Sequence, residues 1–138
     1  MKLTPIVARL KGAGLKRVYG ALELAGLEKS PVHLPAYFVI REAWDASPNR
    51  MQGIHHQQKG ERFGVVIMLA AKALREDGVS EELSEAEGAV IDALAGWVHP
   101  EGDNGCSAAG GRHLTIAGST ASWIVSFTFT AHIRKAPS

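Results

Sequence analysis

The chain has 138 residues, of which 46% are hydrophobic and 21% are charged, and its formal net charge is +1. This length suits one domain, residues 1–138, and the composition is typical of an ordered globular protein. Cys106 is the single cysteine, which excludes an internal disulfide, a zinc ribbon and a CxxC redox pair. The 21 residues His113–Ile133 lack Asp, Glu, Lys and Arg, but their alternation predicts a β-hairpin and not a membrane span.

The first predicted element is a helix that Thr4 caps and in which Pro5 occupies the first position. Its apolar face is formed by Ile6, Val7 and Leu10. The helix is expected to end near Gly12. A second, short helical segment is predicted at Tyr19–Leu27, where leucines recur but two glycines weaken the helix.

Two strands are predicted in the middle of the chain. Leu34–Trp44 is the first, and Glu61–Ala71 is the second. The second has apolar residues on both faces, which indicates a central strand that is covered on each side. Asp45–Lys59 between them is polar and aperiodic and is predicted to be a long loop. Lys72–Val79 has no clear pattern.

Ser84–Val98 is the strongest predicted helix, because its apolar residues form one continuous stripe with helical spacing. Ser84 and Glu87 have the spacing of a capping box. Pro100 and Gly102 are expected to stop the helix. The Gly-rich segment Glu101–Gly111 is predicted to be a loop.

The chain closes with two predicted strands, Arg112–Ile116 and Trp123–Ile133. The last strand alternates between a buried face and a mostly polar face. The buried face comprises Trp123, Val125, Phe127, Phe129, Ala131 and Ile133, and the other face comprises Ile124, Ser126, Thr128, Thr130 and His132. Together the elements predict an α+β fold: a mostly antiparallel sheet of about four strands with helices packed on one side.

Charge is unevenly distributed along the chain. Residues 1–75 contain 12 Lys and Arg against 5 Asp and Glu, whereas residues 76–103 contain 9 Asp and Glu and no Lys or Arg. The two segments either neutralise each other within one fold or form complementary patches of a subunit that stacks head-to-tail with copies of itself.

The residues offer no arrangement for catalysis, and neither a metal nor a cofactor is expected. The six histidines lack the spacing of a metal site. Cys106 lies in a predicted loop that His99 or His113 can approach, but a small loop residue is the favoured interpretation. Arg9, Lys16 and Arg17 make the first half basic, yet no nucleic-acid-binding motif accompanies them.

Six short motifs resemble, in order and spacing, the tail terminator (tail-completion) proteins of long-tailed bacteriophages, and the resemblance covers nearly the whole chain. They are R-V-x-G-A-x-E-L-A (Arg17–Ala25), L-P-A-x-F-V (Leu34–Val39), E-R-F-x-V-V (Glu61–Val66), A-L-x-G-W-x-x-P (Ala93–Pro100), G-G-R-x-L (Gly110–Leu114) and W-x-x-x-F-x-F (Trp123–Phe129).

The resemblance implies a structural virion protein of the tail or neck, assembled in the host cytoplasm, and not an enzyme. It implies a homo-oligomeric ring, usually a hexamer, that caps the tail tube, ends tube polymerisation and meets the head–tail connector. Genomic DNA would pass through the ring without sequence-specific binding. The alternatives are another neck or head-closure component and, less favoured, a small enzyme that uses His55, His56 or Cys106.

A ring needs head-to-tail contacts between subunits. The uncharged polar face of the last strand (Ser126, Thr128, Thr130 and His132) is the first candidate for a contact with a neighbouring subunit or with the tube, because a solvated face usually carries charges. The second candidate is a contact between acidic and basic residues of neighbouring subunits. Its members are Glu81, Glu82 and Glu85 on the acidic side and Arg9, Lys16 and Arg17 on the basic side.

Overall fold

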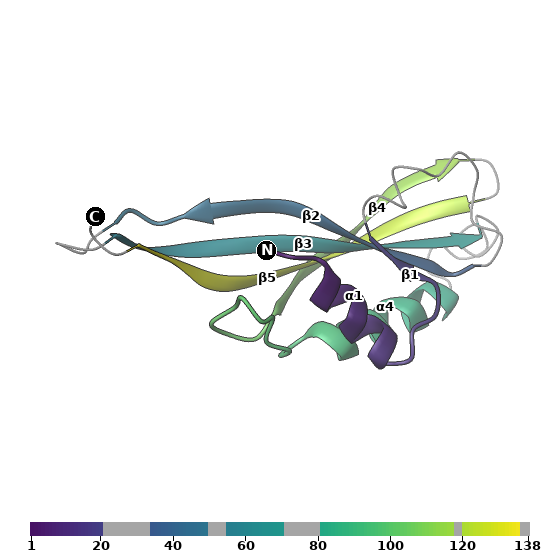
Figure 1. The fold of residues 1–138 in the computed structure, drawn as a ribbon. Coiled ribbons are helices and arrows are strands. Elements are labelled where there is room, and N and C mark those ends of the chain that lie inside the picture. Colours follow the sequence, from purple (N-terminus) through teal and green to yellow (C-terminus); the bar gives the residue numbers. More distant parts are fainter. Residues whose placement is uncertain (21–33, 50–54, 71–80, 118–119, 136–138) are drawn as a thin grey trace.

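A computed structural model describes residues 1–20, 34–49, 55–70, 81–117 and 120–135. Within these ranges the chain forms a five-stranded sheet, in the order β1-β2-β3-β5-β4, with two helices on one face (Figure 1). The elements are α1 (Thr4–Gly12), β1 (Val18–Tyr19), β2 (Ala36–Ala46), β3 (His55–Ala70), α4 (Glu81–Leu94), β4 (Ser107–Ala117) and β5 (Thr120–Lys135). None of the helices in this part of the chain is long and apolar enough to cross a membrane.

The predicted α+β class, with both helices on one side of the sheet, is confirmed. The strand count differs from the expected four because β1 adds a fifth strand, which makes the sheet mixed. β1 pairs in parallel with β2 through Val18 and Tyr19, and the other neighbouring strands are antiparallel. A strand of two residues contains no alternation, so the sequence gives no signal for it.

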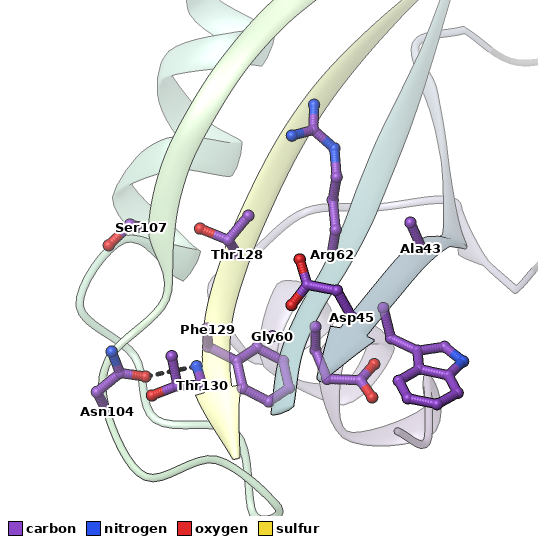
Figure 2. A pocket seen from close by; sticks show the side chains of 11 residues that line it. Ala43, Asp45, Gly60, Arg62, Asn104, Ser107, Thr128, Phe129 and Thr130 are labelled. Atoms are coloured by element: carbon purple, nitrogen blue, oxygen red, sulfur yellow. Dashed lines mark hydrogen bonds between the residues drawn. The ribbon is translucent and has the colours of Figure 1, made fainter. Parts of the chain in front are cut away.

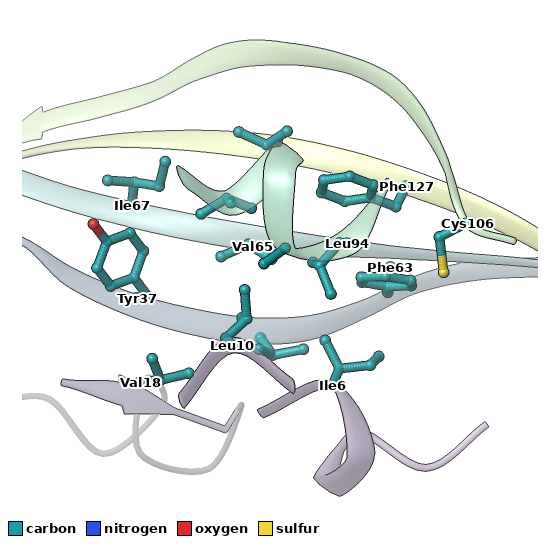
Figure 3. Close-up of a cluster of buried hydrophobic side chains, with 14 of the residues drawn as sticks. Ile6, Leu10, Val18, Tyr37, Phe63, Val65, Ile67, Leu94, Cys106 and Phe127 are labelled. Atoms are coloured by element: carbon teal, nitrogen blue, oxygen red, sulfur yellow. The ribbon is translucent and has the colours of Figure 1, made fainter. Parts of the chain in front are cut away.

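The main core lies between the helices and the sheet (Figure 3). Phe63 of β3 and Phe127 of β5 are fully buried and stack with their ring centroids 5.5 Å apart. Leu10 of α1 and Leu94 of α4 cover the same face. The alternation predicted for β3 is therefore confirmed on the helix side. For β5 it is confirmed at Val125, Phe127, Phe129 and Ala131, whereas Trp123 and Ile133 are only half-buried.

A second, smaller cluster lies on the helix-free face of the sheet. Phe38, Val66 and Ile124 are buried there, each from a different strand. The prediction that β3 is a central strand with apolar residues on both faces is confirmed, since it lies between β2 and β5. The expectation of one mostly polar face on β5 holds only in part, because Ile124 belongs to this cluster.

The first helix forms where it was predicted, but its start differs. Leu3 is the N-cap residue, and no side chain caps the helix, so the predicted capping role of Thr4 is wrong. Pro5 lies in the first turn, where its missing N–H is not needed. Ile6 and Leu10 are buried as predicted.

The second helix, α4, starts earlier than predicted. It includes Glu81, so Ser84 lies inside the helix and the predicted capping box is wrong. Glu81 and Glu82 lie in the first turn, where the helix dipole favours negative charge. The predicted apolar stripe is confirmed in part: Ala86, Val90, Ala93 and Leu94 are buried.

The end of α4 also differs from the prediction. The helix ends at Leu94, and Gly96 follows with a φ of +81°, a conformation that favours glycine. The Gly96 N–H donates to the carbonyl oxygen of Cys106 at 2.8 Å, which turns the chain toward β4. Val98 is therefore outside the helix and 52% exposed, and Pro100 is not the residue that stops it.

Both ends of the predicted loop Asp45–Lys59 are strand, so seven of its ten described residues belong to β2 or β3. β2 continues to Ala46 and β3 begins at His55, because β5 pairs with β3 along this whole length. Likewise β4 begins at Ser107, inside the predicted loop Glu101–Gly111 and before the predicted start at Arg112. Residues 50–54, most of the predicted helix at 19–27 and all of 72–79 lie outside the described residues.

Candidate assembly surfaces

Three strands extend beyond the helices and form an arm (Figure 1). We define the arm as residues 41–46 of β2, 55–62 of β3 and 129–135 of β5. On the outer side of β5, the segment that precedes β4 is held against the arm. The Asp103 N–H donates to the Thr130 carbonyl at 2.7 Å, and the Thr130 N–H donates to Oδ1 of Asn104 at 2.8 Å.

A groove with a volume of about 520 Å³ lies at the base of the arm. Its lining comes from β2, β3, β5 and the segment before β4, and consists of Ala43, Trp44, Asp45, Gly60, Glu61, Arg62, Asn104, Ser107, Thr128, Phe129 and Thr130. Figure 2 shows Asn104 and Arg62 on opposite sides of Thr128. Hydroxyl and amide groups dominate one side, so the groove suits hydrogen bonding to a polar segment of another chain.

The predicted polar face of β5 is split by the fold. Thr128 and Thr130 lie in the groove and are partly exposed. Ser126 is buried, and its hydroxyl donates to Oε1 of Glu42 at 2.6 Å. Ser126 is therefore not part of the accessible surface of the subunit. Its side chain instead positions Glu42, whose other oxygen accepts from Nε of Arg62 at 3.4 Å.

His132 lies farther out on the arm. Its Nδ1 is hydrogen-bonded to Oδ2 of Asp103, and its ring stacks on that of His56 with the centroids 4.8 Å apart. These three residues come from β5, β3 and the segment after α4. Among the described residues no group of three or more His, Cys, Asp and Glu side chains is arranged to hold a metal ion. The expectation that no metal binds stays a prediction.

The charged candidates lie in the helix layer. Arg9 and Arg17 each donate from Nε to a main-chain carbonyl of the same subunit, Ala93 at 2.8 Å and Pro35 at 3.0 Å. Lys16 is exposed. The basic residues thus belong to α1 and the segment that follows it.

The acidic candidates are at the start of α4. Glu81, Glu82 and Glu85 are exposed and form no ion pair with another described residue. Burial raises the pKa of Tyr37, Arg17 lowers it and Glu82 raises it, so both charges lie near the same phenol. For Arg17 and Glu82 this favours neutralisation within the subunit.

A buried carboxylate is the main feature that sequence reasoning missed. Glu61 of β3 is only 2% exposed, because it lies on the helix-facing side of the sheet, as Phe63 does. Its Oε1 lies 2.6 Å from Nζ of Lys59 and 3.3 Å from Nη2 of Arg41. Its position two residues before Phe63 is the signal that indicates burial, because alternate residues of a strand share a face.

Cys106 and His99 are arranged for packing and not for nucleophilic catalysis. Burial raises the pKa of Cys106 to about 11, so the thiol stays protonated at neutral pH. His99 is fully buried and both of its ring nitrogens are occupied. Nε2 is 2.8 Å from the Lys2 carbonyl oxygen, and Nδ1 accepts from the Glu101 N–H at 3.0 Å.

Comparison with protein families gave one finding. A family model described as Phage tail terminator protein matches residues 1–137, which is essentially the whole chain. No curated protein matches the sequence.

Proposed function

We propose that this chain, which belongs to the phage tail terminator family, forms a ring that caps the tail tube and ends its polymerisation. Membership of the family makes the chain a structural component of the bacteriophage tail that acts in tail completion. The match over residues 1–137 carries the proposal, because it spans essentially the whole chain. Beyond family membership, we propose three points: the chain forms a ring, the ring closes the tail tube, and the ring contacts the head connector.

The ring is proposed to be a hexamer. A domain of 138 residues has a diameter of about 35 Å, estimated from a radius of gyration of about 14 Å. Six such subunits in a ring leave an opening about one subunit wide, roughly 35 Å. Genomic DNA would pass through this opening without sequence-specific contacts.

Charge supports a head-to-tail contact between subunits. Glu81 and Glu85 at the start of α4 and Lys16 after α1 are exposed and form no ion pair with another described residue, so they remain accessible to a neighbouring subunit. In a ring the acidic residues Glu81 and Glu85 of one subunit are proposed to face Arg9 and Lys16 of the next. Such a contact is expected to weaken as ionic strength rises.

The groove is proposed to receive a segment of the tube protein. Thr128 and Thr130 supply hydroxyl groups that are partly exposed and uncharged, and Asn104 supplies an amide at the groove wall. The arm projects beyond the helices, so a ring whose axis follows the strands would present this end to a neighbouring layer of the tail (Figure 1).

The purified chain is expected to form a ring of fixed stoichiometry, alone or when tube protein is added. Native mass spectrometry measures the stoichiometry, and electron microscopy of tube protein assembled with and without the chain measures tube length. Tubes are expected to be shorter and uniform when the chain is present. A chain that stays monomeric at all concentrations and leaves tube length unchanged would contradict the proposal.

Thr130→Lys is expected to leave the fold intact and to reduce tube capping. The side chain of Thr130 is partly exposed, so a lysine can reach solvent, but the substitution removes a hydroxyl that is proposed to bond to the tube segment and places a longer, charged side chain in the groove. Thr4→Lys is the matched control, since Thr4 is exposed on α1, away from the groove. Thermal unfolding checks the fold of both variants, and tube length checks capping. Normal capping by Thr130→Lys would exclude the groove as the tube contact.

A head-closure protein of the neck is the second candidate, because it would share a ring and its charge layout. The two differ in partner. Pull-down with tube protein and with connector protein in separate experiments distinguishes them: capture of the tube protein is expected, and capture of the connector alone would favour head closure.

A further inference from the structure

The outer edge of β4 is unpaired in the described part of the chain. β4 is the last strand in the sheet order, and residues 107–114 are exposed. We call residues 107–113 the β4 edge. This segment contains no Pro, Lys, Asp or Glu, and Arg112 is its one charged side chain, so little in its sequence prevents the edge from pairing with another chain. Register shifts at Ala109 and Leu114 leave Gly110–His113 as its regular part.

The opposite side of the sheet also has an open edge. β1 covers β2 only at Tyr37 and Phe38, so β2 has no partner strand on its outer side from Val39 to Ala46 among the described residues. We call residues 39–46 the β2 edge. After a register shift at Glu42, its regular part is residues 43–46. This part contains Trp44, whose side chain is 53% exposed and unusually accessible for its size.

The geometry points to pairing between the β4 edge of one subunit and the β2 edge of the next, so that the sheet continues around the ring. This inference rests on the proposed ring and specifies its subunit contact. Within a subunit, β4 runs opposite to β5 and therefore opposite to β2. A rotation about an axis that follows the strands preserves these directions, so the two edges meet antiparallel, as hydrogen-bonded neighbours commonly do.

The alternation of side chains restricts the register. Opposed residues must lie on the same face of the continued sheet, because a shift by one residue reverses every side chain. Arg112 pairs with Ile124 across β4 and β5, and Ala43 pairs with Arg62 across β2 and β3. Arg112 and Ala43 therefore both lie on the helix-free face. On β3, Val66 is in register with Ile124 and Arg112, and Arg62 is in register with Ala43. These two positions on β3 are four residues apart. One register that obeys this rule opposes Arg112 to Ala43, Gly111 to Trp44, Gly110 to Asp45 and Ala108 to Ala46.

In this register the residues that pair at the β4 edge and at the β2 edge of one subunit are offset by four residues along the strand direction. A closed sheet needs an offset of this size. Four strands of each subunit (β2, β3, β5 and β4) would contribute, so the offset is one residue per strand. With a rise of about 3.3 Å per residue and a strand spacing of about 4.8 Å, the strands tilt by about 35°. Closed barrels have tilts of about 35–45°. This result does not depend on the number of subunits.

The helices must then lie outside the ring. Six subunits give 24 strands and a backbone diameter of about 45 Å, which leaves a lumen of about 35 Å once side chains are included. A helix layer about 10 Å thick on the inner wall would narrow the lumen to about 15 Å. The helix-free face would line the lumen, and α4 of one subunit would approach α1 of the next, because α1 packs beside β1 and α4 lies over β3.

The opposed edges complement one another in charge. Gly111 is already covered within its own subunit, because Nε1 of Trp123 and Oε2 of Glu87 fill the position that a Cβ would take. Arg112 would lie diagonally across from Asp45 on the same face, within reach of an ion pair. Both side chains are exposed and form no ion pair with another described residue.

A cysteine pair tests the contact in the full chain. Ala46→Cys and Ala108→Cys introduce exposed cysteines that would be directly opposed between subunits. Under mild oxidation the double variant is expected to form covalent multimers up to the size of the ring. Each single variant, and the control pair Ala8→Cys with Ala108→Cys, is expected not to form this series of covalent multimers. Cys106 is buried and protonated, so it does not interfere.

A charge exchange provides an independent readout. Arg112→Asp and Asp45→Arg are each expected to weaken subunit association by about tenfold, and the double variant is expected to restore it. Analytical ultracentrifugation measures the association. If the wild-type chain forms a ring but the cysteine pair does not cross-link and the double exchange does not restore association, the edge contact is wrong and the proposed function stands. If the wild-type chain forms no ring with or without tube protein, the proposed function fails as well.

Discussion

Phe127→Ala is expected to lower the free energy of unfolding by about 3–5 kcal/mol, the largest effect of a single substitution that we predict. Phe127 is fully buried, and its ring stacks on Phe63 at a centroid distance of 5.5 Å. Removing it leaves a cavity between the sheet and the helices, where neither strand can move inward because both are paired on each side. Urea denaturation followed by circular dichroism measures the change.

Val98→Ala is the control for this prediction. Val98 is also apolar, but it is 52% exposed, so its truncation is expected to change stability by less than about 0.5 kcal/mol. Both variants must be compared at one protein concentration, because association adds to apparent stability. A Phe127→Ala variant that unfolds at the same urea concentration as Val98→Ala would contradict the described core.

His99→Ala is expected to lower the free energy of unfolding by about 2–4 kcal/mol. His99 is fully buried and stacks on Phe129 with the ring centroids 5.1 Å apart. Its two nitrogens satisfy the Lys2 carbonyl and the Glu101 N–H. The substitution therefore creates a cavity and leaves two main-chain groups without their partner.

His99→Phe separates these two contributions. Phenylalanine retains a ring that can stack on Phe129 but cannot bond to either main-chain group, so a loss of about 1–3 kcal/mol is expected. Denaturation measurements on both variants at pH 7.5 provide the comparison. If His99→Phe is as stable as the wild-type chain, the two hydrogen bonds do not stabilise the fold, and ring packing alone accounts for the loss in His99→Ala.

The sequence predicts the elements that are buried on one side. The alternation Phe63, Val65, Ile67 in β3 and the helical spacing in α4 follow from burial of one face, and both are confirmed. Element ends are predicted less well. Ser84 has the spacing of a cap, yet the helix starts three residues earlier, because a capping pattern can occur inside a helix as readily as at its start.

The arm shows why polar strands escape sequence analysis. Residues 55–60 are polar and have no alternation, but they pair with β5 and extend β3 beyond the helices. A strand outside the core buries neither face, so its pattern carries no period. The candidate surface is affected in the same way: Thr128 and Thr130 are accessible as expected, whereas Ser126 is buried because Glu42 from another strand accepts its hydrogen bond.

The sequence by itself determines the fold class, the central place of β3, the buried face of β5 and the resemblance to the family, because these depend on residues that are close in the chain or on ordered motifs. The tertiary structure decides which polar residues remain accessible, that Arg41 of β2 lies beside the carboxylate of Glu61, and that β2 and β4 each leave an edge open within the described residues. These features depend on pairing between strands that are far apart in sequence, and local periodicity contains no information about such pairing.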